Sequence, residues 1–145
     1  MQTFLPYKSF EESAACLDYK RLGKQRVEAY QILRCITAPH LHKGWGNHPA
    51  VRMWRRYEGA LRLYGYTMCM EWVKRGYKDG LMHTFDPNIV KVSMPEWLGY
   101  EPFHLSHRKA LLEKDYDFYR RYDWQIVPEI DYFWPSKSTM FGHKE

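Results

Sequence analysis

The spacing of apolar residues along the chain predicts helices rather than strands. Between residues 18 and 37, apolar residues recur at helical intervals, at Leu22, Ala29, Leu33 and Ile36. Asp18 suits the N-cap of such a helix, and Pro39 lies just beyond its last turn. We therefore expect a long amphipathic helix from Asp18 to Thr37.

A second amphipathic segment runs from His48 to Gly76. Pro49 suits a first helical position, and Gly76 suits a C-terminal stop. The apolar stripe of this segment consists of Val51, Trp54, Leu61, Tyr64 and Met68, with Arg62 outside it. Gly59 and Gly65 each cost about 1 kcal/mol relative to alanine inside a helix, which predicts a bend or close packing of helices there.

The remaining chain predicts shorter or irregular elements. Ser9 and Glu12 form a capping box for a short helix, and a third long helix is expected from Ser106 to about Tyr122. Glycine and proline make 38–47 and 77–104 irregular, with a short strand-like run at 89–92. The aromatic segment 124–145 is too apolar to remain in water. The prediction is an all-α domain with three main helices, irregular connections and a packed aromatic tail.

Length and composition narrow the class of protein. The chain has 145 residues, enough for one domain with its own core, and its mean hydropathy is −0.65. It contains no long apolar run and no secretory signal after Met1, so we expect a soluble, cytoplasmic monomer. The three cysteines lie far apart without a C-x-x-C pattern and are interpreted as small core residues.

Charge is divided unequally between the two halves of the chain. Residues 1–75 contain 13 Lys and Arg against 6 Asp and Glu, whereas residues 76–145 contain 9 against 11. Aromatic residues make up 17% of the chain. A basic half with aromatic residues is typical of a nucleic-acid partner, but a solvated basic face over an aromatic core explains the same numbers.

One acidic residue lies within a basic stretch of the first long helix. Arg21, Lys24, Gln25 and Glu28 occupy positions i, i+3, i+4 and i+7, and therefore share one side of a helix. One interpretation is a Lys24–Glu28 ion pair on a solvated face. The other is a catalytic carboxylate within a phosphate-binding surface.

Histidine and tryptophan supply further candidates, whereas no metal or cofactor site is expected. His40, His42 and His48 surround one loop, but they lack the additional ligands of a zinc site. His48 suits a helix cap or a phosphate contact. Trp45 lies between Gly44 and Gly46, where it could stack on a base. His104 and His107 lie at the expected start of the third helix. A capping or phosphate contact explains them about as well as a packed or surface position without chemistry.

The run from Leu17 to Ala29 resembles the first-helix segment of the pyrimidine-dimer DNA glycosylase family, the phage endonuclease V type. The resemblance continues through Asn47-His48-Pro49, Lys74-Arg75-Gly76-Tyr77 and Phe103-His104-Leu105-Ser106-His107. It differs from the phage pattern at Arg21, where that enzyme has histidine, and at Val27, where it has arginine. Glu28 falls where the family keeps its catalytic glutamate.

This resemblance implies a DNA glycosylase that releases a damaged pyrimidine through an amine nucleophile and cleaves the strand by β-elimination. In that family the amine is the N-terminus. Residue 2 is glutamine, a poor context for methionine removal, so the amine would belong to Met1, with Lys24 as the alternative. The expected partner is double-stranded DNA. The residues expected to line the site or contact DNA are Lys20, Arg21, Gln25, Arg26, Trp45, His48, Arg52, Arg55 and Arg56.

Two other functions fit the same residues. One is a DNA-binding module without catalytic activity, and the other is an N-glycosidase that acts on free nucleosides or nucleotides. The sequence leaves open whether the target base is a dimer, an oxidised pyrimidine or a hypermodified pyrimidine.

Overall fold

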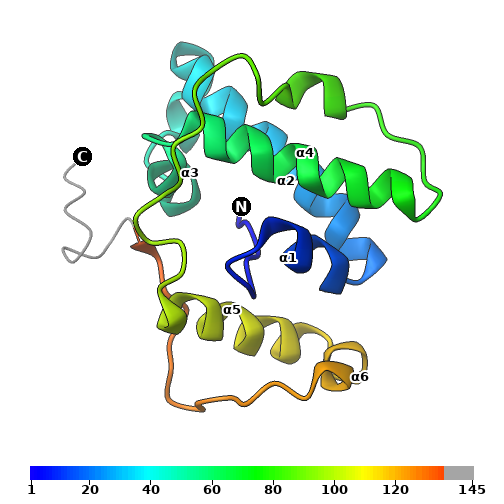
Figure 1. Cartoon of the computed structure of the whole chain (residues 1–145). Helices are drawn as coiled ribbons and strands as arrows, with labels where there is room; N and C mark the ends of the chain where they lie inside the picture. The colour runs from blue at the N-terminus through cyan, green and yellow to red at the C-terminus, as the bar shows by residue number, and fades with distance from the viewer. Residues whose placement is uncertain (136–145) are drawn as a thin grey trace.

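The structure, a computed structural model, describes residues 1–135 and consists of helices joined by turns and extended segments (Figure 1). The α-helices are α1 (Phe10–Cys16), α2 (Tyr19–Thr37), α3 (Pro49–Trp54), α4 (Glu58–Lys74), α5 (Glu101–Lys114) and α6 (Tyr116–Tyr119). Four 3-10 helices occupy Pro39–Leu41, Lys43–Trp45, Met82–Phe85 and Arg120–Tyr122. Residues 1–135 contain no strand, so the predicted all-α class is confirmed, and α2, α4 and α5 are its longest helices.

The first two helices begin where their caps predict. The Ser9 side chain accepts a hydrogen bond from the Glu12 backbone N–H at 3.1 Å, which caps α1. Asp18 caps α2 by accepting from the Arg21 backbone N–H at 3.3 Å. The apolar side of α2 faces α4, and the two helices pack along much of their length (Figure 1).

The predicted second helix is two helices. At Tyr57 the backbone has φ −130° and ψ 48°, outside the helical region, and its N–H bonds to the Trp54 carbonyl at 2.7 Å. The chain therefore turns between α3 and α4, although the predicted apolar stripe is buried throughout. Arg62, expected outside that stripe, is buried because it pairs with Glu58 at 2.9 Å.

The predicted third helix starts earlier and ends sooner. Pro102 lies within the first turn of α5, where a proline needs no hydrogen-bond partner, so the helix begins at Glu101 rather than Ser106. It ends before Asp115, whose φ of −154° breaks the helix. The Asp115 side chain then caps α6 by accepting from the Phe118 backbone N–H at 3.2 Å.

The two glycines of α4 provide close contact with the segment that follows the helix. A Cβ on Gly59 would lie 2.4 Å from the Lys91 carbonyl oxygen, and one on Gly65 would lie 2.4 Å from the buried Phe85 ring. Close packing is found at both glycines, but Gly65 packs on the Met82–Phe85 3-10 helix and Gly59 on the extended segment after it, not on another long helix. The strand-like run at 89–92 forms no strand.

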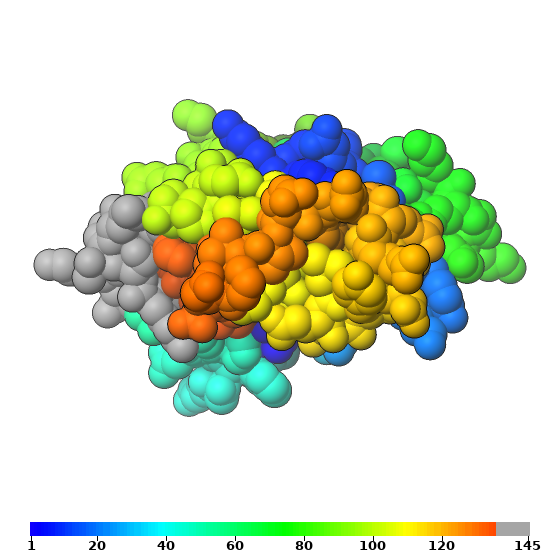
Figure 2. All heavy atoms as spheres, turned by 90° about the horizontal axis from the view of Figure 1, so that it is seen from below, coloured from blue at the N-terminus to red at the C-terminus, as the bar shows by residue number. Residues whose placement is uncertain are grey.

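The segment after α6 returns along α5. Figure 2 shows it, in orange, lying across α5, in yellow. Lys109 donates hydrogen bonds to the Pro128 and Ile130 carbonyls at 2.7 and 2.8 Å, and the Phe133 N–H donates to Ser106 Oγ at 3.0 Å. The predicted packing of the tail is therefore found as far as residue 135, and residues 136–145 lie outside the described part.

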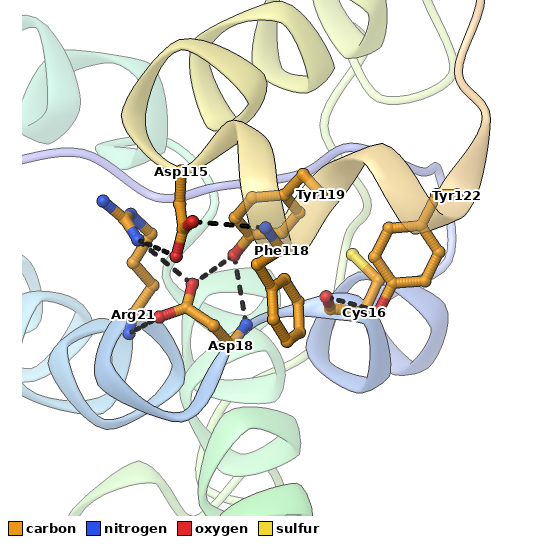
Figure 3. A network of polar contacts seen from close by, with 7 residues as sticks. All are labelled: Cys16, Asp18, Arg21, Asp115, Phe118, Tyr119 and Tyr122. Carbon is orange, nitrogen blue, oxygen red and sulfur yellow. Dashed lines mark hydrogen bonds and ion pairs between the residues drawn. The ribbon is translucent and has the colours of Figure 1, made fainter.

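A polar network connects the start of α2 to α6 (Figure 3). The Tyr119 hydroxyl donates to Asp18 Oδ1 and accepts from the Asp18 backbone N–H. Arg21 approaches Asp18 at 3.2 Å and Asp115 at 4.0 Å. The Tyr122 hydroxyl donates to the Cys16 carbonyl at 2.8 Å. Residues far apart in the sequence therefore fix the N-terminus of α2.

Cys16, Cys35 and Cys69 are buried free thiols, as expected, and burial raises the pKa of both Cys16 and Cys69 to about 12. None of the helices in residues 1–135 combines the length and apolar character that crossing a membrane requires.

Candidate active site

Residues 3–6 are buried, Met1 and Gln2 are half-buried, and the N-terminus is near the centre of Figure 1. The Phe4 N–H donates to Gln25 Oε1 at 2.8 Å, and the Leu5 N–H donates to His107 Nδ1 at 2.9 Å. His104 Nδ1 lies 2.7 Å from the Leu5 carbonyl oxygen. Residues from α2 and α5 thus hold an extended segment that has no sheet partner.

His104 and His107 are therefore structural. Burial lowers the pKa of both histidines, and that of His107 lies well below its ordinary value. A neutral His107 can accept the Leu5 N–H at Nδ1 only with its proton on Nε2. Of the two interpretations that the sequence left open for this pair, the geometry supports packing.

Glu28 lies at the inner end of this segment. It is 8% exposed, and Gln25 Nε2 donates a hydrogen bond to its Oε2 at 2.9 Å. The Gln2 backbone also lies close enough to lower the pKa of this carboxyl group. Burial is the largest influence and raises the Glu28 pKa above its ordinary value, against the lowering effects of the Lys24 and Met1 charges.

Gln25 connects Glu28 to the protein interior. Its Oε1 accepts from Phe4 N and from the Tyr64 hydroxyl, at 2.8 and 2.7 Å. With that oxygen committed to two donors, the amide nitrogen must face Glu28. Gln25 is 1% exposed, so it supports the carboxylate from inside instead of lining the surface. Helical spacing places Gln25 on the same side of the helix as Glu28 but does not show whether Gln25 is buried or exposed. The sequence therefore could not distinguish a residue that supports the carboxylate from one that lines the surface.

A cavity of about 550 Å³ opens beside Glu28. Its walls are formed by Met1, Glu28, Tyr30, Gln31, Arg34, Cys35, His42 and Trp45. The predicted catalytic pair and the predicted stacking residue thus share one cavity, and Trp45 is 53% exposed at its rim. The cavity therefore brings a buried carboxylate, the N-terminal residue and a partly exposed aromatic ring together.

The structure adds cavity residues that sequence reasoning did not select. Gln31 and Arg34 follow Glu28 by three and six residues on α2, so helical spacing could have indicated Gln31. His42 lies in a loop without periodicity, which gave no signal for its position. Tyr132, from the C-terminal segment, is buried close enough to Glu28 for the carboxylate charge to contribute to its raised pKa.

Lys24 is exposed on α2 and forms no ion pair with Glu28, so the surface ion pair considered from the sequence is absent. A nucleophilic lysine is commonly desolvated, which Lys24 is not.

The other basic candidates have different surroundings. Arg21 is held by Asp18 and Asp115, and Arg26 pairs with Asp79 at 2.8 Å. Lys20, Arg55 and Arg56 are exposed, and Arg52 is half-buried.

His48 caps α3 by accepting from the Ala50 N–H at 3.0 Å. Its ring also contacts Trp45 and Trp134, with centroids 6.1 and 6.0 Å away. Trp134 therefore brings the C-terminal segment close to the rim of the cavity.

The exposed side of α2 carries no acidic residue. Around this side of α2, starting next to Glu28, the exposed residues are Lys24, Gln31, Lys20, Val27, Arg34, and then Tyr19 and Thr37. Asp18 and Glu28, the acidic residues nearest to this side, are buried. The carboxylate therefore lies at the edge of a basic surface, and residues 1–135 contain no cluster of side chains that could hold a metal ion.

The described residues thus form a helical protein with a buried carboxylate beside a basic helix surface. A family model described as pyrimidine dimer DNA glycosylase matches residues 1–85, which include α1 to α4, Met1 and Glu28. The match covers more than half of the chain, which therefore belongs to the pyrimidine dimer DNA glycosylase family. No curated protein and no solved structure matches the chain.

Proposed function

We propose that the protein is a DNA glycosylase with abasic-site lyase activity that acts on a damaged or modified pyrimidine in double-stranded DNA. Family membership supports a DNA substrate. The observation that carries the proposal is that Met1 and Glu28 line one cavity, with the N-terminal charge close enough to the Glu28 carboxylate to lower its pKa.

In the proposed reaction the neutral Met1 amine attacks C1′ of the damaged nucleotide. The bond between C1′ and the base breaks, and its electron pair leaves with the base. Glu28 stabilises the positive charge that develops on the sugar and accepts a proton from the attacking nitrogen. Ring opening then gives a Schiff base between the nitrogen and C1′.

Strand cleavage follows from the Schiff base. Removal of a C2′ proton moves an electron pair toward the iminium, and the C3′–O bond breaks with loss of the 3′ phosphate group. Water finally hydrolyses the imine and restores the amine. Lys24 and Trp45 flank this site in the proposal, Lys24 as a phosphate contact and Trp45 as a stacking surface for a displaced base.

Borohydride trapping tests the proposal directly. The protein would be incubated with an abasic duplex and with duplexes that carry a pyrimidine dimer or an oxidised pyrimidine, and the imine would be reduced to a stable adduct. Peptide mapping should place the adduct on Met1, and Lys24→Arg, which retains the charge without a primary amine, should trap DNA as the wild type does.

The contrary results are equally specific. Absence of both adduct and base release with all three substrates would eliminate the glycosylase and favour a binding module. An adduct on Lys24 would retain the reaction and replace its nucleophile.

A further inference from the structure

A stack of aromatic rings lies at the end of the α2–α4 pair, away from the cavity. The Trp72 and Tyr77 rings are stacked, with centroids 4.2 Å apart and planes 25° apart. Tyr19 continues the stack beyond Tyr77 at 6.4 Å and 26°. Tyr19 is 53% exposed and Tyr77 is 41% exposed, so the outer rings lie at the surface.

The stack rests on a fixed base. Arg26 lies over the Trp72 ring at 4.8 Å and is held by Asp79, and Trp72 Nε1 donates to the Lys78 carbonyl at 2.9 Å. Gly23 gives this ring its space, because a Cβ there would lie 2.9 Å from Trp72. The inner ring is therefore anchored on both sides, and the outer rings are presented in a defined orientation.

The charge around the stack is positive. Three exposed lysines each lie within two positions along the sequence of a residue in the stack: Lys20, Lys74 and Lys78. The neighbouring acidic residues Glu71 and Asp79 are each paired with an arginine. We call Tyr19, Trp72, Tyr77 and these three lysines the aromatic–lysine patch.

The exposed basic side of α2 connects the patch to the candidate active site. Tyr19 precedes Glu28 by nine residues on α2, a rise of about 13 Å, and the two residues border opposite edges of the exposed basic side of that helix. Because the two residues also lie half a turn apart around the helix, the path over its surface is longer than this rise and needs at least about four nucleotide steps of 3.4 Å. A strand that enters the cavity can therefore pass over Lys24 and Lys20 and reach the patch.

We propose that the aromatic–lysine patch binds an unpaired DNA segment next to the lesion, with Tyr19 and Tyr77 contacting bases and the lysines contacting phosphates. Aromatic rings among lysines are suited to unpaired nucleotides, because every base has a face for stacking and every nucleotide carries a phosphate. Paired DNA keeps its base faces covered and offers the patch only phosphates. This inference rests on the proposed DNA substrate, but it requires no catalytic step.

The test compares two abasic DNAs that differ only in a flank of about four nucleotides, which is paired in one and unpaired in the other. The wild type should bind the DNA with the unpaired flank at least about tenfold more tightly, because bases stacked on Tyr19 and Tyr77 add contacts that paired DNA cannot make. The double variant Tyr19→Ala/Tyr77→Ala should remove this preference, and Tyr19→Phe/Tyr77→Phe should retain it.

The matched control is Tyr116→Ala, a tyrosine 62% exposed on α6 in the acidic half of the chain, which should leave the preference unchanged. Equal wild-type affinity for the two DNAs would overturn the inference, as would a preference that survives in the alanine double variant. Because binding alone is measured, loss of the preference would support the patch even if no glycosylase activity were found.

Discussion

At the scale of single residues, Gln25 contributes in a way that its spacing does not reveal. It donates to Glu28 while its oxygen accepts from Phe4 and Tyr64, so one amide fixes both the carboxylate and the N-terminal segment. In the proposed reaction it is a positioning residue, because it touches the carboxylate and not the DNA.

Gln25→Leu should therefore change the pH profile of the reaction. Without the amide donor the Glu28 pKa rises further, so the loss of activity on acidification should begin at a higher pH than in the wild type. The measurement is the single-turnover rate of borohydride-trapped adduct formation against pH. Tyr64→Phe is the control, since it keeps the bond from Gln25 to Glu28. If the rate fell at the same pH on acidification in Gln25→Leu and in the wild type, the positioning role would be disproved.

Glu28→Gln separates catalysis from stability. The variant should lose about 10²- to 10⁴-fold in rate because it removes the proton acceptor. Burial raises the folded-state pKa of Glu28, so the stability contributed by this group decreases as the pH rises through that pKa. The variant should consequently melt at a higher temperature than the wild type at pH 7, and the gain should shrink below the ordinary pKa of glutamate. A lower Tm at pH 7 would contradict this account.

The sequence identified Glu28 and Met1 through a resemblance, and the structure places both at one cavity. From the sequence, Gln25 was expected to line the site or contact DNA, whereas it is buried. Helical spacing shows which residues share a side of a helix, but not which of them are buried. Helical spacing also could not show that Arg26 is paired, since its partner Asp79 lies 53 residues away along the chain. The catalytic and DNA-contact roles of these residues stay predictions.

At the scale of elements, sequence periodicity identified the helices better than their ends. Caps formed by neighbouring residues, at Ser9 and Asp18, were predictable because the chemistry is local. The breaks at Tyr57 and Asp115 were not, because each apolar stripe continues across the break. Backbone conformation, rather than side-chain pattern, ends those helices.

The glycines of α4 allow a direct test of close packing. Gly65→Ala places a methyl group against the buried Phe85 ring and should lower the free energy of unfolding by about 1–3 kcal/mol. Gly80→Ala is the matched control, because a Cβ there meets nothing within 4 Å, and its effect should be below about 1 kcal/mol. Urea unfolding measures both variants, and equal midpoints would refute the packing argument.

At the scale of the whole molecule, the network in Figure 3 connects the part that matches the family to the part that does not. Burial raises the Asp18 pKa, but hydrogen bonds from Tyr119 and Arg21 outweigh this effect and leave it below its ordinary value. The contribution of Asp18 to stability is therefore present at neutral pH and is lost as the pH falls below about 4.

Asp18→Asn should lower the free energy of unfolding at pH 7 by about 1–3 kcal/mol, and the difference from the wild type should shrink at pH 3. Urea unfolding at the two pH values measures this effect. Asp117→Asn, an exposed aspartate on α6, should change stability by less than about 0.5 kcal/mol. A deficit of the same size at both pH values would show that ionisation of Asp18 is not the cause.

The contacts of Leu5 with α5 also determine when the site can form. Leu5 and His107 are 102 residues apart, so their bond must wait until almost the whole chain has left the ribosome. A nascent chain, or a fragment that ends before α5, would contain Met1, Lys24 and Glu28 without the histidines that hold the N-terminal segment beside them. Assembly of the candidate site therefore depends on α5, which lies outside the part of the chain that matches the family.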